Sequence, residues 1–176
     1  MNRQWLDGMW DHMRQKYGIY LRVLDAIPAD QFHANPIADM RTPAQLVVHT
    51  SGSILRDIAE GVASGTIGAD EGGEDEVASG LATKSDVIAF ARDCWARADA
   101  AIAKVDDAQL AGGVENPWGM ALNGTFAMVI LNDEFLHHRG QLFAYARACG
   151  GEPPFMWGFG DNPEGCLLYT SPSPRD

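Results

Sequence analysis

A carboxylate, an imidazole, an amide and a phenol recur at helical spacing near the C-terminal end of the sequence. They belong to Glu134, His138, Gln141 and Tyr145, within an apolar run over residues 126–148 that has no proline. An α-helix advances about 100° per residue, so these four side chains fall within roughly 60° of one another. Burying them without partners would be costly, and a bound cation would satisfy them. The stripe therefore indicates a metal site inside a helix bundle.

The same residues have simpler interpretations that the sequence leaves open. Glu134 and His138 could form an ion pair one helical turn apart, which contributes only a few tenths of a kcal/mol on an exposed surface. Gln141 could hold a metal ligand or a bound water in place by a hydrogen bond without binding the metal itself, or it could simply pack with an ordinary amide hydrogen bond.

Gly140 costs about 1 kcal/mol relative to alanine in mid-helix, which indicates the close approach of another helix.

Four long helical segments must position these residues. Apolar spacing predicts helices over about 4–26, 42–63, 83–105 and 124–149. The second begins at Thr42-Pro43-Ala44-Gln45, a capping box with proline at the first helical position. Residues 64–80, rich in glycine and acidic residues, and residues 106–123 are predicted as loops. No strand pattern or internal repeat is present, so we expect an all-α fold, a four-helix bundle with long connecting loops.

The composition narrows the class of protein. A chain of 176 residues with 46% hydrophobic residues can form one domain with a substantial core. No apolar run reaches the ~20 residues that span a membrane, and the N-terminus lacks the pattern of a signal peptide. The net charge of −11 would repel nucleic-acid phosphates, and three cysteines without a CxxC pair fit a reducing compartment. We therefore expect a cytoplasmic protein that binds neither nucleic acid nor membranes.

The last eleven residues have a different origin. They match, codon for codon, the in-frame translation of a transposase-type sequencing adapter. We therefore assign residues 1–165 to a single domain and treat residues 166–176 as a probable translated artefact, so the natural C-terminus is expected to differ. These residues are Cys166-Leu167-Leu168-Tyr169-Thr170-Ser171-Pro172-Ser173-Pro174-Arg175-Asp176.

The last long helix carries a second apolar stripe, away from Glu134. A helix in a lone four-helix bundle needs only one buried stripe, so a second one predicts a homodimer. The alternative is that the 106–123 loop or the apolar segment after Gly150 covers the stripe within one chain. The stripe consists of Phe126, Val129, Leu136 and Phe143.

Several motifs in this chain resemble those of DinB-like proteins, a family of metal-binding helix bundles. The usual pattern of their last helix is H-x-x-x-H-H-R-G-Q-L-x-x-Y-x-R, followed by glycine and proline. The matching string here is Glu134, then His137-His138-Arg139-Gly140-Gln141-Leu142, Tyr145-Ala146-Arg147 and Gly150-Gly151-Glu152-Pro153-Pro154. Thr42-Pro43-Ala44-Gln45-Leu46-Val47-Val48-His49 resembles the second-helix motif of the family, and Leu24-Asp25-Ala26-Ile27-Pro28-Ala29-Asp30 its helix-one exit.

The resemblance, which covers residues ~5–160, implies a divalent metal held by His49, Glu134 and His138. Glu134 departs from the family, where histidine is usual at this position. Two imidazoles and a carboxylate suit Zn, Ni, Mn or Fe. Helical periodicity alone places His49 on a solvated polar face, so only the resemblance assigns it as a ligand.

The resemblance also implies a function. Characterised members include thiol-dependent S-transferases and isomerases, so we expect a metal-dependent enzyme that activates a low-molecular-weight thiol toward a small electrophilic substrate. A metal-dependent hydrolase, in which water replaces the thiol, is the second expectation. A non-catalytic, metal-binding stress or structural dimer is the alternative from another class, since the sequence shows no general base beside the ligands.

Overall fold

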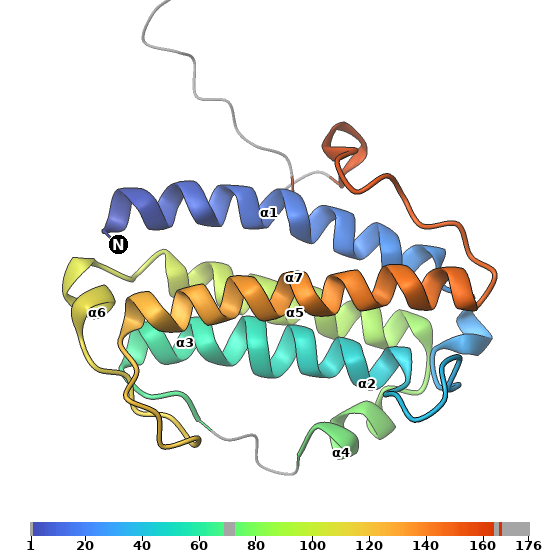
Figure 1. The fold of residues 1–176 in the computed structure, drawn as a ribbon, viewed down its shortest axis with the longest axis horizontal. Coiled ribbons are helices and arrows are strands. Elements are labelled where there is room, and N and C mark those ends of the chain that lie inside the picture. Colours follow the sequence, from blue (N-terminus) through green and yellow to red (C-terminus); the bar gives the residue numbers. More distant parts are fainter. Residues whose placement is uncertain (1, 69–72, 164–165, 167–176) are drawn as a thin grey trace, which may run out of the picture.

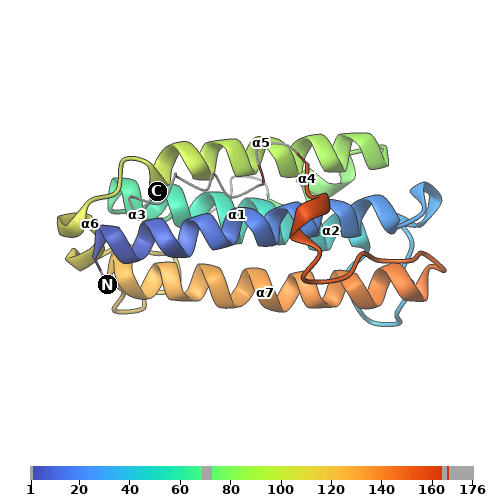
Figure 2. The same ribbon diagram turned by 90° about the horizontal axis from the view of Figure 1, so that it is seen from above.

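Four long helical rods form the body of the protein: the first and last run in one direction, and the two between them run in the opposite direction (Figures 1 and 2). The computed structural model describes residues 2–68, 73–163 and 166. The rods are α1 (Arg3–Ala26), the continuous run α2 (Pro43–Val48), η2 (His49–Arg56) and α3 (Asp57–Ser64), then α5 (Lys84–Ile102) and α7 (Gly124–Ala148). In the described part of the chain the only β pairing is two isolated bridges. The all-α bundle prediction is therefore confirmed.

Local capping explains where the second and third rods begin. The hydroxyl of Thr42 accepts a hydrogen bond from the Gln45 amide, and the Gln45 side chain accepts one from the Thr42 amide at 2.8 Å. Thr83 and Asp86 repeat this reciprocal pair at the start of α5. Each pair satisfies two of the amides that the first turn of a helix leaves without partners.

Stacked aromatic rings join α1 to α5 inside the core. Trp95 lies between Trp10, at 5.1 Å between ring centroids, and Tyr17, at 4.4 Å. The Tyr17 hydroxyl donates to the carbonyl of Ala91, so its polar end is satisfied although the side chain is buried. These large buried rings therefore contribute to the packing of α1 against α5.

Two segments predicted as loops contain helices, which corrects the sequence analysis. In residues 64–80, α4 (Gly73–Gly80) packs against α2, while residues 69–72 lie outside the described part. The first turn of α4 is acidic, and negative charge at the N-terminus of a helix is stabilised by the helix dipole. In residues 106–123, α6 (Asp107–Ala111) begins with a capping box between Asp106 and Gln109. High glycine and acid content concealed both short helices.

The middle of the second rod is wider than an α-helix. Over His49–Arg56 the chain forms a π-helix, and the amide of Asp57 bonds to the carbonyl of Gly52, five residues back. Such segments are rare and are often found at functional sites. The sequence predicted an uninterrupted α-helix here.

Gly140 does not mark the close approach of a helix, which corrects that prediction. A Cβ built on Gly140 would have no atom within 4 Å. Glycines with close neighbours lie elsewhere, including two positions near the start and just beyond the end of α7. A Cβ would collide with the carbonyl oxygen of Gln109 at Gly124 and with that of Ala26 at Gly151.

The C-terminal part of the chain folds back over the bundle. After α7, a segment that includes η3 (Phe159–Asp161) returns along α1 and α7 (Figure 2). Of residues 166–176 only Cys166 is described, and it is buried. The assignment of the remaining ten residues therefore lies outside the described part. None of the described helices combines the length and apolarity needed to cross a membrane.

Candidate metal centre

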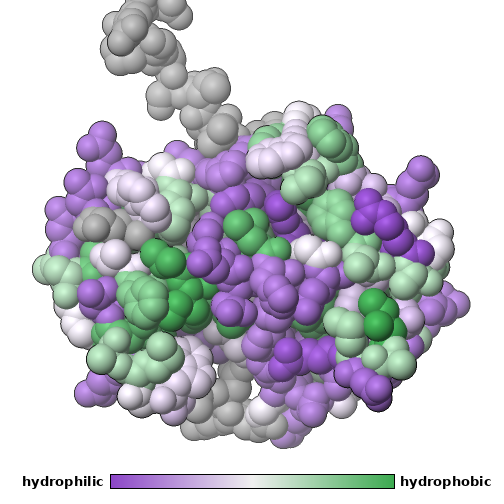
Figure 3. Space-filling model, viewed as in Figure 1, coloured by the Kyte–Doolittle hydropathy of each residue, from purple (hydrophilic) through white to green (hydrophobic). Residues whose placement is uncertain are grey.

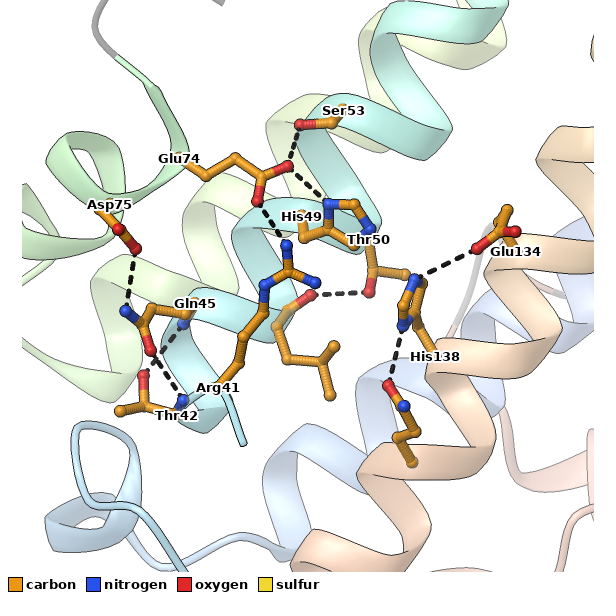
Figure 4. Close-up of polar contacts among 12 residues, drawn as sticks. Arg41, Thr42, Gln45, His49, Thr50, Ser53, Glu74, Asp75, Glu134 and His138 are labelled. Carbon is orange, nitrogen blue, oxygen red and sulfur yellow. Dashed lines mark hydrogen bonds and ion pairs between the residues drawn. The ribbon is translucent and has the colours of Figure 1, made fainter. Parts of the chain in front are cut away.

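Of the three predicted ligands, the two histidines meet between the second rod and α7, and Glu134 lies against one of them. His49 is the first residue of the π-helical segment, and Glu134 and His138 face it from α7 (Figure 4). The two imidazole rings meet edge to face, with centroids 4.6 Å apart. Glu134 Oε2 lies 3.4 Å from His138 Nε2. His49 and His138 thus approach one another from two different rods, and Glu134 contacts His138 from the same helix.

His138 presents a lone pair at Nε2. Its Nδ1 lies 2.8 Å from the side-chain oxygen of Gln141, which can only accept, so Nδ1 carries the proton. The amide nitrogen of Gln141 lies 3.2 Å from His137 Nε2, which is consistent with this orientation of the amide. His138 is 6% exposed, and its Nε2 has no hydrogen-bond partner among the described residues. A buried basic nitrogen held in this way fits a metal ligand.

His49 is held in the same manner by a residue from α4. The carboxylate of Glu74 accepts from His49 Nδ1 at 2.5 Å and from the hydroxyl of Ser53 at 2.7 Å. Arg41 pairs with its second oxygen at 3.2 Å. Because the carboxylate accepts at Nδ1, the lone pair of His49 is again on Nε2. Both imidazoles therefore present the same nitrogen for binding.

The pKa shifts agree with these protonation states. Burial alone would raise the pKa of Glu74, but hydrogen bonds from His49 and Ser53, with the charge of Arg41, lower it below its usual value. Glu74 is therefore an anion at neutral pH. Burial lowers the pKa of His138, with the hydrogen bond to Gln141 opposing, so its imidazole is neutral.

The three candidate ligands do not surround one common point in the described structure. In the described ranges no three histidine, cysteine or acidic side chains are already grouped as a metal cage. Glu134 lies against the Nε2 of His138 itself, and 46% of its side chain is exposed. Two imidazoles and one partly exposed carboxylate nevertheless match the donor atoms that a divalent transition metal takes.

Tyr145, the fourth member of the predicted polar stripe, does not join the centre. Its hydroxyl donates to the carbonyl of Arg41 at 2.6 Å, and the side chain is buried. This bond ties α7 to the segment before α2, whose Arg41 side chain pairs with Glu74. Tyr145 therefore helps to position Arg41, which pairs with the residue that holds His49.

Glu74 is the residue that sequence reasoning missed. It lies in an acidic, glycine-rich stretch that predicted a loop, 25 residues from His49. A weak signal was present: the polar stripe of His49 and Ser53 on an otherwise apolar helix needed partners, and the neighbouring acidic segment could supply them. Gln45, on the same face, bonds to Asp75 of α4 at 2.9 Å.

A small cavity opens beside His49. It has a volume of about 290 Å³, and its walls include Ser53, Asp57, Glu74 and Trp118. Asp57 is paired with Arg56 at 2.6 Å. The cavity thus combines carboxylates with an exposed aromatic ring, next to one of the three candidate ligands.

Comparison with known proteins identifies the family. The sequence pattern of the DinB superfamily matches residues 12–142, which is well over half of the chain and includes all three candidate ligands. The chain belongs to the DinB superfamily. It is also similar to the crystal structure of a DinB-like protein from Bacillus subtilis, with a TM-score of 0.60 and 19% identity, over 78% of this chain and 89% of the other. That similarity supports the DinB-like fold. No curated protein matches the chain.

Proposed function

We propose that this DinB superfamily protein is a divalent-metal-dependent enzyme whose ion is held by His49, Glu134 and His138. The observation that carries the proposal is the buried Nε2 of His138, which makes no hydrogen bond within the described structure and faces Glu134 at 3.4 Å, while its Nδ1 is anchored by Gln141. His49, anchored by Glu74, faces it with the same arrangement. Outer partners that fix the tautomer are typical of metal-ligating histidines.

Three protein ligands leave positions open on the ion. A bound metal lowers the pKa of a thiol or water on it, which supplies a nucleophile at neutral pH. Around it, Glu74 and Gln141 hold the two imidazoles in their ligating orientation, and the cavity beside His49 offers room for a small electrophile. Transfer to a low-molecular-weight thiol is the activity we favour, with hydrolysis second.

One observation favours the non-catalytic alternative. The carboxylates on the cavity wall are both engaged, Glu74 by His49 and Arg41, and Asp57 by Arg56. A general base must be in reach of the proton that it removes and must not be fully committed elsewhere. A metal-binding stress or structural protein would need the ligands but no such base.

Metal content tests the site. Protein prepared in medium supplemented with Zn, Ni, Mn and Fe is expected to carry close to one ion per chain by elemental analysis. The double variant His49→Ala/His138→Ala should lose the ion, because both imidazole ligands are removed. His33→Ala, a change at an exposed histidine outside the site, is the matched control and should retain it. Metal-free wild type, or full occupancy in the double variant, would overturn the assignment.

Activity separates the three functions. Metal-loaded protein is mixed with a panel of small electrophiles, with and without cysteine as a low-molecular-weight thiol. Thioether formation that is lost in His138→Ala supports the transferase. Metal-dependent product that forms without the thiol indicates a hydrolase. A protein that binds its metal but turns over no substrate in either condition supports the non-catalytic alternative.

A further inference from the structure

A second, larger cavity lies on another side of α7, away from the metal centre. Its volume is about 950 Å³, and residues of α1, α7 and the segment after α7 form its walls. The segment is held to α1: Arg22 donates to the carbonyl of Gly158 at 2.7 Å, and the Asn162 amide donates to the carbonyl of Gln15 at 2.9 Å. The cavity is therefore a built feature with three fixed walls.

Most of the lining is apolar and part of it is open to solvent. Leu136 and Phe143 contribute from α7, and Phe155, Met156, Trp157 and Phe159 from the returning segment. Phe155 is 71% exposed and Trp157 58%. Hydrophobic residues gather over the end of α7 and this segment in Figure 3. An open apolar recess of this size indicates a binding site for an apolar body.

One wall of the cavity is cationic, in a chain whose net charge is −11. His12 and Lys16 line it from α1, and Arg139 and Arg147 from α7. Arg139 is only 8% exposed, and its NH1 group has no hydrogen-bond partner among the described residues. Lys16 is 9% exposed and donates only to the neutral side chain of Asn132, at 3.0 Å. Neither cation makes an ion pair within the described residues, and buried cations without such a partner are costly, so the wall is suited to an anion.

The pKa shifts of the groups on this wall also favour a bound anion. Burial lowers the pKa of Lys16, and the nearby charge of Arg139 lowers it further, while the charge of Asp133 opposes them. Burial and the charges of Lys16 and Arg139 likewise lower the pKa of His12. Burial lowers the pKa of Arg139 as well, so all three groups are destabilised as cations, and an anion placed among them would oppose that effect.

Gly140 keeps the floor of the cavity clear. It lines the cavity, and a Cβ built on it would meet nothing within 4 Å. A larger side chain at this position would project into the open space. The helix therefore carries glycine at the point where a ligand would lie closest to its backbone.

We propose that this cavity binds a small amphiphilic anion, a hydrocarbon chain that ends in one carboxylate. The carboxylate pairs with Arg139 and Lys16, and the hydrocarbon lies against Leu136, Phe143 and the apolar segment. A second copy of this chain fits less well, because an apolar contact here would bury Arg139 without a counter-charge. The inference is independent of the metal centre, since none of the three candidate ligands lines the cavity.

Binding of dodecanoate to the full chain tests the proposal. Isothermal titration below the micellar concentration compares dodecanoate with dodecanol and dodecyltrimethylammonium, which have the same chain but no negative charge. Dodecanoate should bind at least tenfold more tightly than either, and equally well to protein stripped of metal by a chelator. Equal affinity for the acid and the alcohol, or no binding, would overturn the proposal.

Two variants locate the site. Arg139→Met removes the unpaired charge, and Gly140→Leu fills the space without altering any charge. Each should weaken dodecanoate binding at least tenfold, whereas Lys104→Gln, at an exposed lysine elsewhere, should leave it unchanged. If Arg139→Met does not fold, Gly140→Leu alone decides. Full affinity in Gly140→Leu would place binding elsewhere, and a change of oligomeric state in that variant would identify the cavity as a contact between copies.

Discussion

At the scale of single residues, the centre depends on what holds each imidazole from behind. Gln141 fixes His138 and Glu74 fixes His49, in each case through Nδ1. The spacing of Glu134, His138 and Gln141 within one helix made their meeting predictable from sequence. Glu74 could not be found in that way, because its approach to His49 depends on how α4 packs against α2.

The charge of Glu74 should therefore affect metal binding although it is not assigned as a ligand. Glu74→Gln keeps the size of the side chain but removes the anion that makes His49 a stronger donor. We expect about 10- to 100-fold weaker metal binding with little change in the unfolding midpoint. Titration against a competing chelator measures this, with Glu76→Gln, an exposed acid of the same helix, as control. Unchanged affinity would show that His49 does not contribute to binding.

Glu134 sets the preference among metals. Glu134→His restores the residue that is usual in the family and replaces a hard anionic oxygen with a neutral nitrogen. Binding should persist and shift toward Zn or Ni over Mn, measured by competition between the ions. The same preference and affinity in both proteins would mean that Glu134 is not a ligand.

At the scale of elements, the sequence predicted correctly where helices begin, but it predicted less well which neighbours their faces pack against. The capping residues Thr42 and Thr83 mark true helix starts, because the bonds that they make are local. Gly140 was misread, since a glycine in mid-helix can face either a neighbouring helix or open space. The sequence alone does not distinguish the two, because the answer depends on how the segment after α7 lies over α1.

Open space at Gly140 predicts a stabilising substitution. Gly140→Ala should raise the free energy of unfolding by about 1 kcal/mol, since alanine favours the helix and its Cβ meets no atom. Urea unfolding at equilibrium measures the change. Gly124→Ala is the matched contrast: there the Cβ would collide with the Gln109 carbonyl, and stability should fall. A destabilised Gly140→Ala would indicate that another chain packs against this face.

At the scale of the whole molecule, the second apolar stripe of α7 is only partly covered. At its far end, Leu136 and Phe143 line the large cavity together with the returning segment. Phe126, at the near end, is 46% exposed, and Figure 3 shows a second hydrophobic area over the start of α7. The sequence showed an excess of apolar surface on this helix, but not which part the chain itself would cover.

The uncovered end keeps the homodimer as a prediction. Light scattering at micromolar concentration should give twice the 19.1 kDa mass of the chain. Phe126→Glu should dissociate the dimer, because a charge would replace an apolar contact at its centre. Asp133→Asn, at an exposed position of the same helix, is the control. A monodisperse monomer of the wild-type protein would contradict the prediction.

The π-helical segment after Val48 has a consequence for comparing this chain with its relatives. A π turn holds about one residue more than an α turn, so the chain carries surplus length between His49 and Asp57. A relative that is α-helical throughout this stretch can be aligned correctly only with a gap there. Without the gap, every position up to Ser64 would be matched to a neighbour about 100° away around the helix. Inferences about Ser53 or Asp57 drawn from such an ungapped alignment would concern the wrong face of the rod.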